Sequence, residues 1–436
     1  MSVSENALKS AIASHREGKL DEAEAAYQAI LAEDPDNVGA LHFLGVLHHH
    51  RGNDDAAIGL IHRAITLAPD NIDAVNNLGN IQLKMSALAE AEATYRAALK
   101  LRPDFADGYN NLGLVLGLLG RPEEAETALE RAIALEPRQA GFHHNLGLLL
   151  RRRGLTLQAI AAFKVAIALD PTQSRSFEAM AQAQYIQSRT PAEAIVTLTQ
   201  WLARDPDHPA ARHMLSALTG TGVEPRASDH YIKHLFDNYA ESFDGHLARL
   251  DYNAPRLLAT AVRAVLGEPA GDLRVLDAGC GTGRWGELLR PFARELTGVD
   301  LSGGMLELAR RNRGYDRLEE AELTAFLAAQ HGAYDLIFSA DTLVYFGDLA
   351  ALAAAAADAL DPGGILAFTV ERLEEKEGSP PFALEYHGRY AHSRSYLVQT
   401  MTDVGFDIAH LETGTQRLER GMPVVGWVLV ARKPAA

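Results

Sequence analysis

The chain has 436 residues, enough for about two or three domains, and 47% of them are hydrophobic, as in ordinary globular proteins. Its formal net charge of −16 argues against a general nucleic-acid binder and against a protein that binds anionic membranes. The single cysteine, Cys280, rules out a disulfide within the chain and fits a reducing, cytoplasmic compartment. No stretch has the length and apolarity of a membrane span or the pattern of a signal peptide, so we expect neither.

The first half of the chain contains an internal repeat with a period of 34 residues. An amphipathic stretch ends in a proline at each repeat, at Pro35, Pro69, Pro103, Pro137 and Pro171, and Pro206 follows 35 residues later. Four central repeats also place a Leu-Gly pair in the preceding helix and an alanine twelve residues after its glycine, at Gly45 and Ala57, Gly79 and Ala91, Gly113 and Ala125, and Gly147 and Ala159. Small residues at both positions let two antiparallel helices approach closely, and the proline ends the second helix.

This pattern resembles the tetratricopeptide repeat (TPR), and the resemblance implies six helix pairs over residues 4 to 208. Ala11 and Ala181 replace the glycine in the first and sixth repeats, as is common in terminal repeats. We predict a TPR solenoid at residues 4–218, a turn-rich linker at 219–228 and a second domain at 229–436.

The TPR resemblance implies a concave groove lined by the first helix of each pair. Asn77, Asn111 and Asn145 recur at one repeat position that faces this groove in the family, and amide side chains can hydrogen-bond the backbone of an extended peptide. We therefore predict a protein or peptide partner, with the alternative that these asparagines only cap or solvate the groove. His48, His49 and His50 are adjacent on a helix and point in different directions, so we expect no metal site there.

The second half is organised around residues 274–284. An apolar strand runs into Asp277, and Gly279, Gly281 and Gly283 follow at alternating positions before a helical pattern. Glycines let the backbone turn sharply and let a ligand approach it, and the helix that follows presents free N–H groups. The spacing G-x-G-x-G differs from the G-x-G-x-x-G of dinucleotide binders.

This turn resembles motif I of class I S-adenosylmethionine (SAM) dependent methyltransferases. Further features follow in the order of that family, namely an acid at a strand end 23 residues after Asp277 (Asp300), the buried strand at 335–341 and the Pro-Gly-Gly turn at 362–364. The resemblance spans roughly residues 228–433 and implies an α/β Rossmann-like domain with a mostly parallel, seven-stranded sheet and SAM as cofactor. The predicted protein is thus multidomain, an all-α TPR solenoid followed by this domain, and it resembles a group of bacterial TPR-containing methyltransferases.

The resemblance also implies roles for residues around the turn. Asp300 would bind the ribose hydroxyls, because a carboxylate accepts two hydrogen bonds from a diol. Residues near the adenine would be Leu301 and Met305. The pair Glu322-Leu323 would follow, with the acid facing the adenine amino group, and Ser339 and Ala340 would open onto the crevice. Glutamate is a departure at position 322, where aspartate is usual; Glu320 is an alternative, and so is a merely solvated acidic loop. An aromatic-rich segment at 229–244 resembles the lid of small-molecule methyltransferases, or it is a helix that only docks on the domain.

Residues 380–394 follow the fifth strand, where members of the family build the acceptor pocket. His387, Tyr386 and His392 are candidate bases or orienting groups, Tyr345 is a further candidate, and Arg389 suits an anionic acceptor. The alternative is that these residues only pack or solvate a loop.

The sequence thus predicts a SAM-dependent methyltransferase whose TPR array docks a protein or peptide. A small-molecule methyltransferase with an array used for assembly, and a non-catalytic TPR adaptor, remain alternatives. The methyl acceptor, the partner and the oligomeric state stay open.

Overall fold

A computed structural model describes residues 3–237, 240–312, 314–419 and 422–435. The chain folds as two compact units, Met1–Thr190 and Pro191–Ala436. The linker predicted at residues 219–228 lies inside the second unit, and the domain boundaries drawn from the sequence stay a prediction. None of the helices formed by the described residues is long and apolar enough to cross a membrane.

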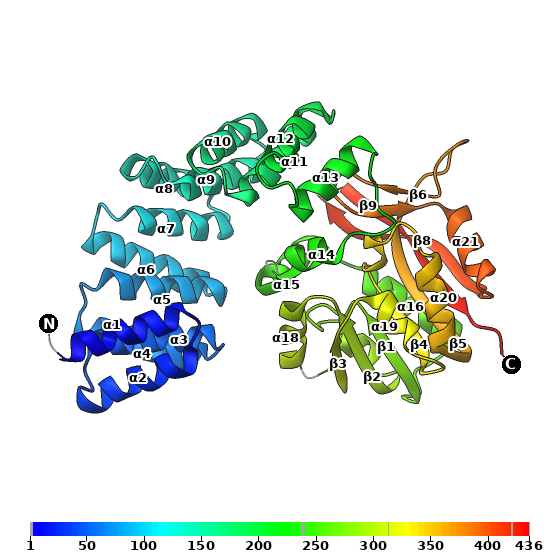
Figure 1. The fold of residues 1–436 in the computed structure, drawn as a ribbon, viewed down its shortest axis with the longest axis horizontal. Helices are drawn as coiled ribbons and strands as arrows, with labels where there is room; N and C mark the ends of the chain where they lie inside the picture. Colours follow the sequence, from blue (N-terminus) through cyan, green and yellow to red (C-terminus); the bar gives the residue numbers. More distant parts are fainter. Residues whose placement is uncertain (1–2, 238–239, 313, 420–421, 436) are drawn as a thin grey trace. The chain divides into compact units, whose positions relative to one another are not determined.

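The first unit consists of antiparallel helix pairs that follow one another along the chain, blue to green in Figure 1. Its helices are α1 (Val3–Arg16), α2 (Leu20–Glu33), α3 (Val38–His50), α4 (Asp54–Leu67), α5 (Ile72–Lys84), α6 (Leu88–Leu101), α7 (Ala106–Leu118), α8 (Pro122–Leu135), α9 (Ala140–Arg152), α10 (Thr156–Leu169) and α11 (Ser174–Ser188). Each repeat proline from Pro35 to Pro171 lies two residues beyond a helix end, as the sequence predicts.

A glycine in the first helix of a pair lets the two helices approach closely. A Cβ atom at Gly79 would lie 2.6 Å from the ring of Tyr95, and one at Gly113 would lie 2.7 Å from Leu129 of the partner helix. Tyr95 is fully buried, as is Ala91, the small residue one turn before it. The period-34 glycine is therefore required because a large side chain of the second helix fills the space where its Cβ would lie.

The helices of the second unit lie partly before the first strand and partly between the strands of an α/β domain. They are α12 (Ala192–Leu202), α13 (Pro209–Thr219), α14 (Asp229–Asp237), α15 (Ala240–Arg249), α16 (Ala254–Leu266), α17 (Gly286–Leu289), α18 (Gly303–Asn312), α19 (Leu323–Ala328), the 3-10 helix η1 (Leu343–Tyr345), α20 (Ala350–Ala359) and α21 (Arg394–Asp403). The strands are β1 (Leu273–Ala278), β2 (Ala293–Asp300), β3 (Arg317–Glu320), β4 (Tyr334–Ser339), β5 (Leu360–Arg372), β6 (Phe382–Leu384), β7 (Tyr390–His392), β8 (Asp407–Glu419) and β9 (Met422–Arg432).

The sheet is mostly parallel, as expected. Strands β3, β2, β1, β4 and β5 pair in that order in parallel, and β9 and β8 continue the sheet through antiparallel pairing. Over the described residues the sheet has nine strands rather than the predicted seven. The difference is the short β6–β7 hairpin, whose β7 pairs with the end of β5 at Glu371 and Arg372. Residues 380–394, expected to form a loop over the acceptor, thus include this hairpin.

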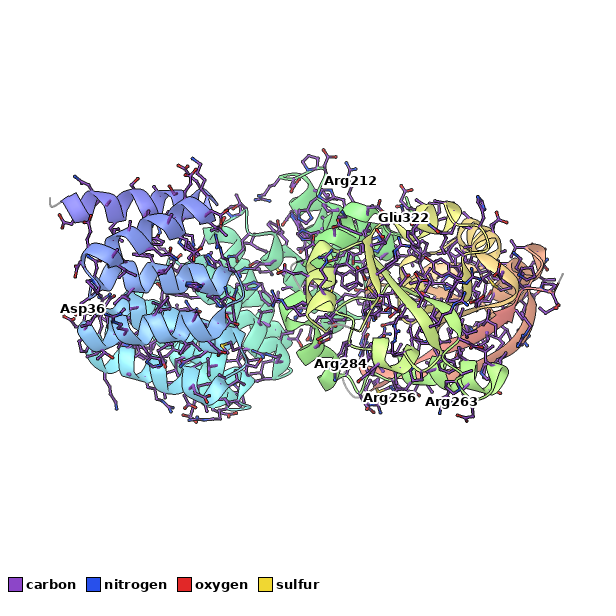
Figure 2. All side chains as sticks on the ribbon, turned by 90° about the horizontal axis from the view of Figure 1, so that it is seen from below. Asp36, Arg212, Arg256, Arg263, Arg284 and Glu322 are labelled. Carbon is purple, nitrogen blue, oxygen red and sulfur yellow. The ribbon has the colours of Figure 1, made fainter. Side chains whose placement is uncertain are left out.

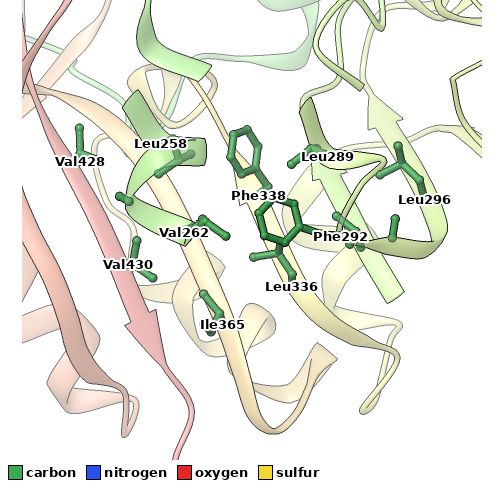
Figure 3. Packing of buried hydrophobic residues seen from close by; sticks show 14 residues of the cluster. Leu258, Val262, Leu289, Phe292, Leu296, Leu336, Phe338, Ile365, Val428 and Val430 are labelled. Atoms are coloured by element: carbon green, nitrogen blue, oxygen red, sulfur yellow. The ribbon is translucent and has the colours of Figure 1, made fainter. Parts of the chain in front are cut away.

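The core of the second unit lies between the sheet and α16 (Figure 3). Leu258 and Val262 of α16 pack with Phe338 of β4 and with the central strand residues Leu336, Ile365, Val428 and Val430. The near-continuous apolar runs of β4 and β5 suit strands that are covered on both faces. This packing fixes the strands so that the carboxyl ends of β1, β2, β4 and β5 share one edge.

Substitution of Gly79 tests the packing of the helix pairs. Gly79→Ala places a Cβ against the Tyr95 ring, and we expect a loss of stability of about 1 to 3 kcal/mol that exceeds the helix-propensity gain of up to about 1 kcal/mol. Gly59 of α4 is an exposed helical glycine whose Cβ would meet nothing within 4 Å, so Gly59→Ala is the matched control. The thermal midpoint of the first unit, followed by circular dichroism, should fall in the first variant and stay or rise in the second. Equal midpoints would contradict this account.

Candidate active site

The glycine turn lies at the carboxyl end of β1. Gly279, Gly281 and Gly283 have φ angles of 87°, 54° and 74°, which residues with side chains rarely adopt. A Cβ atom at Gly279 would overlap Thr342, whereas one at Gly281 would meet nothing within 4 Å. The turn is therefore closely packed at Gly279 and open at Gly281, where a ligand can approach the backbone.

Asp300, at the carboxyl end of β2, holds this turn. Its Oδ2 accepts a hydrogen bond of 2.8 Å from the N–H of Gly281, and its Oδ1 accepts one of 2.9 Å from the N–H of Ser302. Burial raises the pKa of Asp300 above its usual value, although these backbone hydrogen bonds act in the opposite direction.

Asp277 is a second buried carboxylate at the same edge. Its Oδ2 accepts a 2.6 Å hydrogen bond from the hydroxyl of Tyr315. Burial, assisted by the charge of Asp300, raises the pKa of Asp277 to about 7. Among the described residues no lysine or arginine pairs with either carboxylate. The site therefore carries buried negative charge that a cationic ligand would compensate.

Helices α14 and α15, within the segment compared to a lid, contact the turn. The hydroxyl of Thr282 donates to Asp244 Oδ1 at 2.8 Å, and the hydroxyl of Ser302 donates to Asp237 Oδ1 at 2.5 Å. Phe236 packs edge-on against the ring of Tyr345, with ring centroids 5.6 Å apart. The segment thus reaches both the glycine turn and one of the acceptor candidates.

The residues expected near the adenine are placed at the ends of β2 and β3. Leu301 is half-buried and Met305 is buried at the start of α18. Glu322 caps α19, because its two carboxylate oxygens accept from the N–H groups of Thr324 and Ala325. The neighbouring residue, Leu323, is buried.

Other predicted residues take structural contacts. The hydroxyl of Ser339 donates to the carbonyl of Ala278 at 2.8 Å and so joins β4 to β1. Ala340 is half-buried at the core cluster. Glu320, the alternative to Glu322, accepts a 2.9 Å hydrogen bond from Lys233 of α14.

Trp285, two residues beyond Gly283, supplies an unsatisfied donor. Its Nε1 is buried and has no hydrogen-bond partner among the described residues. Arg256 and Arg284, labelled in Figure 2, lie over its ring at 6.0 and 5.4 Å from the centroid, and the ring of Tyr252 lies 5.9 Å away. The turn thus has an open glycine, and among the described residues it has two carboxylates without a paired cation and an indole N–H without a hydrogen-bond partner. Together these groups fit a polar ligand with positive charge.

A buried ionic cluster lies beyond the turn, at the ends of β4, β5 and β8. Its centre is Arg417, whose side chain is only 1% exposed. Arg417 Nη2 pairs with Glu371, its Nε donates to Glu419 at 2.8 Å, and its Nη1 donates to Asp341 at 3.2 Å. Asp341 itself adopts a left-handed conformation with φ of 57°. The charge of Arg417 therefore holds three strand ends together.

Three of the predicted acceptor residues join this cluster. Arg389 Nη1 donates to Glu419 at 3.0 Å and lies 3.6 Å from Glu371, and His387 Nε2 lies 3.4 Å from Glu371. Tyr345 is buried, which raises its pKa, and the nearby guanidinium of Arg389 opposes that rise.

Tyr386 and His392 lie differently. Tyr386 is exposed, with its ring centroid 5.0 Å from that of His387. His392 is fully buried in β7, where its Nε2 contacts the carbonyl of Gly347 at 3.0 Å and burial lowers its pKa to about 4. Its ring stacks on Tyr396. The geometry shows His392 packed within the sheet, and a role as base or orienting group stays a prediction.

Sequence reasoning missed Glu371, Glu419 and Arg417. Glu371 had a signal, because an acid directly after a buried apolar strand repeats the pattern of Asp300 and Asp341. Arg417 had none, since two of its three partners, Glu371 and Asp341, are 46 and 76 residues away and only the sheet brings them together.

Both halves of the chain match known protein families. A family model described as a methyltransferase domain matches residues 250–411, and models of the tetratricopeptide repeat match residues 8–72, 87–120 and 119–174. The chain joins tetratricopeptide repeats to a methyltransferase domain.

Curated relatives match the methyltransferase domain. Methyltransferase-like protein 27 of Homo sapiens is 33% identical over 138 residues, which are 31% of this chain and 56% of that protein. Malonyl-(acyl-carrier protein) O-methyltransferases of Enterobacter lignolyticus and Priestia megaterium are 38% and 29% identical over 96 and 168 residues. These matches cover 22% and 38% of this chain and 38% and 58% of the relatives. The chain thus spans only part of the length of each relative.

Solved structures are similar to part of the chain. That of MamA is 26% identical at a TM-score of 0.34 and covers 40% of this chain and 98% of its own. That of PilW, a type IV pilus biogenesis factor, is 21% identical at a TM-score of 0.45 and covers 49% and 99%. Both scores are too low to support a functional comparison.

The TPR asparagines form a ladder between successive repeats. Asn111 donates to Asn76 at 3.0 Å, and Asn145 donates to Asn110 at 2.8 Å. Asn77 contacts His42 Nε2 at 2.8 Å, so all three bonds join residues 35 apart. The side-chain amide of each predicted groove asparagine is therefore engaged inside the TPR array, and peptide binding by these asparagines stays a prediction.

The histidine run of the TPR array contacts three different partners. His48 lies 3.9 Å from Glu24, His49 contacts Asp54 at 2.6 Å, and His50 contacts His15 at 3.0 Å. The imidazoles thus diverge, as expected for adjacent residues on a helix.

Asp277 gives the methyltransferase domain a pH dependence of definite sign. Its folded-state pKa of about 7 exceeds the ordinary value of 3.8, so between these values the folded chain holds a proton that the unfolded chain has released. The free energy of unfolding therefore falls as pH rises through this window, by up to about 1.4 kcal/mol per pH unit.

Asp277→Asn removes this contribution and keeps an acceptor for Tyr315. Urea unfolding at about pH 5 and about pH 8 should show the variant gaining stability relative to wild type at the higher pH. A difference that stays constant between the two pH values would contradict the raised pKa.

Arg417→Met leaves Asp341, Glu371 and Glu419 without the cation that they share. We expect a loss of about 3 to 5 kcal/mol in the free energy of unfolding near neutral pH. The control is Arg311→Met, which breaks an exposed 2.9 Å pair with Glu307 on α18 and should cost less than about 0.5 kcal/mol. Similar losses for both variants, measured by urea unfolding, would argue that the cluster does not stabilise the domain.

Proposed function

We propose that the second unit is a SAM-dependent methyltransferase. The observation that carries this is the turn at Gly281, which is open to a ligand and bordered by two buried carboxylates, Asp277 and Asp300. No lysine or arginine in the described part of the chain pairs with either carboxylate. SAM carries both a sulfonium and an ammonium group, and so supplies the missing positive charge together with an already activated methyl group. The match to a methyltransferase family model supports this assignment.

The chain's own residues would position SAM. The turn of Gly279, Gly281 and Gly283 would receive its amino-acid end, and Asp300 would bind the ribose hydroxyls while it also holds Gly281. The buried indole N–H of Trp285 is a donor for the ligand's carboxylate.

The adenine would pack on the remaining predicted residues, namely Leu301, Met305, Glu322, Leu323, Ser339 and Ala340. Because both oxygens of Glu322 cap α19, recognition of the adenine amino group by this side chain would have to share these oxygens with the cap.

We infer that the TPR array docks a protein or peptide, possible substrates included, since such repeats commonly bind protein partners. A cytoplasmic location fits the single buried cysteine. A small-molecule methyltransferase with an array used for assembly is the runner-up, and a non-catalytic adaptor is the third interpretation.

Calorimetry with SAM tests the cofactor assignment. Asp300→Ala should weaken SAM binding by about 10- to 100-fold, since it removes hydrogen bonds to a charged group. Asp335→Ala is the control, because Asp335 also accepts a backbone N–H bond, from Arg274, but lies at the start of β4, at the opposite end of the strands from the turn. No SAM binding by the wild type, or equal loss in both variants, would sink the enzymatic interpretation.

Removal of residues 1–190 tests docking. The cut lies at the boundary between the two units, so that helix α13 and Glu224, which contact the acceptor segment, are kept. His213 of α13 contacts the carbonyl of Gly388 at 2.8 Å, and Tyr390 donates to the carbonyl of Glu224 at 2.8 Å. Residues 191–436 should keep the SAM affinity of the full chain but lose most methyl transfer to protein in a cell lysate. Undiminished transfer to the same acceptor would refute docking and favour the runner-up.

A further inference from the structure

The ionic cluster carries more negative than positive charge. Its two arginines, Arg389 and Arg417, face three carboxylates, Asp341, Glu371 and Glu419. The positive charge of Arg417 and Arg389 lowers the pKa of Glu419 to about 2, against the effect of burial, so this carboxylate is ionised at neutral pH. Both guanidinium groups are thus already occupied by carboxylates of the chain. An anionic acceptor would enter a cluster with one net negative charge, contrary to the anion-binding role expected of Arg389.

His387 is the neutral member of the cluster. Its Nε2 lies 3.4 Å from Glu371 Oε2, and its Nδ1 is buried with no hydrogen-bond partner among the described residues. A carboxylate next to Nε2 favours the tautomer that carries the proton there, and this tautomer leaves the lone pair of Nδ1 free. The imidazole therefore has the arrangement of a base that is oriented by an acid.

Burial of the imidazole keeps His387 unprotonated at neutral pH. Burial lowers its pKa, and Arg389 of its own segment and Arg417 of β8 lower it further. Glu371 of β5 and Glu419 of β8 act in the opposite direction without reversing the shift. Glu371 stays ionised, because the positive charges of Arg417 and Arg389 lower its pKa despite burial.

The cluster is continuous with the glycine turn. Arg417 joins Glu371 to Asp341, and the next residue, Thr342, lies against Gly279, with its hydroxyl 3.4 Å from the Gly279 carbonyl. A group bound beside His387 thus lies on the same carboxyl edge of the sheet as the turn.

We propose that His387, oriented by Glu371, is the general base for methylation of a neutral hydroxyl group, and that the cluster disfavours carboxylate acceptors. This inference rests on the proposed function and names the acceptor class for it. An ammonium acceptor would have to lose its proton fully before attack, which an imidazole with a lowered pKa does poorly. A hydroxyl can instead lose its proton as the new bond forms.

The step balances in atoms and charge. The hydroxyl oxygen attacks the methyl carbon, the C–O bond forms, and the C–S bond breaks with its electron pair left on sulfur. The hydroxyl proton passes to Nδ1 of His387, and the resulting imidazolium lies next to the Glu371 carboxylate before it releases the proton to water. The products are a methyl ether and a neutral thioether.

The chemical stability of the transferred label tests the acceptor class. A cell lysate is incubated with the full chain and methyl-tritiated SAM, and the labelled products are treated with alkali or with hydriodic acid. A methyl ether resists alkali and releases methyl iodide in hydriodic acid, and this is the expected result. Label released by alkali marks an ester, and label that resists both treatments marks a methylamine; either result overturns the inference but leaves the proposed function standing. A lysate with no incorporated label overturns both.

Two variants test the base. His387→Asn should lower labelling about 10²- to 10⁴-fold with SAM affinity unchanged. Glu371→Gln should shift the acidic limb of the pH–rate profile to lower pH, because the carboxylate raises the pKa of His387. Labelling that is insensitive to His387→Asn overturns the assignment.

A spectroscopic readout does not depend on activity. In full-length protein with ¹⁵N-labelled histidine, the resonances of His387, identified by their loss in His387→Asn, should show a protonated Nε2 and a bare Nδ1 near neutral pH. A proton on Nδ1 would overturn the proposal, even if Glu371→Gln failed to fold.

Discussion

Burial of carboxylates at the carboxyl edge of the parallel sheet is the constraint on which the second unit depends. Asp277 and Asp300 end adjacent strands, and the hydrogen bond of Asp300 to Gly281 shapes the turn between β1 and α17. Among the described residues, these charges are compensated by backbone N–H groups and one tyrosine hydroxyl, and no lysine or arginine pairs with them. These hydrogen bonds stabilise the buried carboxylates in part, and the site still favours a ligand that brings positive charge.

A second group of carboxylates lies along the same edge, and here the chain itself supplies the compensating positive charge. At the ends of β4, β5 and β8 three carboxylates are compensated from within, by Arg417 and Arg389. The first pair of carboxylates thus suits a cationic ligand, whereas the second set is already neutralised apart from one charge. In the proposed function, this contrast would separate a cofactor side from an acceptor side along a single edge of the sheet.

Residues 219–228, predicted as a linker, and helix α13 contact residues of the proposed acceptor side. The N–H groups of Gly347 and Asp348 both donate to the carbonyl of Pro225 at 2.8 Å, and the N–H of Ala227 donates to the carbonyl of Tyr345 at 2.8 Å. Tyr231 stacks on His213, with ring centroids 4.2 Å apart. These contacts explain why the second compact unit begins at Pro191, well before the turn-rich stretch that the sequence suggests as a linker.

Much of the fold could be predicted from the sequence, because its signals are local or periodic. The glycine and alanine positions of the repeats follow from close helix packing, and the strand ends were marked by acids after apolar runs. The asparagine ladder was only half predicted: the recurring position was visible, but bonding to the preceding repeat depends on how repeats stack. The pairing of β7 with β5 and the contacts of Arg417 with Glu371 and Asp341 were not predictable, since they join segments that lie apart in the sequence.

The proposed function depends most on Asp277, a buried, partly protonated carboxylate whose negative charge a cationic ligand would compensate. The most direct measurement is the heat of SAM binding to the full chain at pH 7 in buffers of different ionisation enthalpy. Since the pKa of Asp277 is about 7, SAM binding should release up to about half a proton more from the wild type than from Asp277→Asn. The same buffer dependence in both proteins, or no binding of SAM by the wild type, would contradict the account.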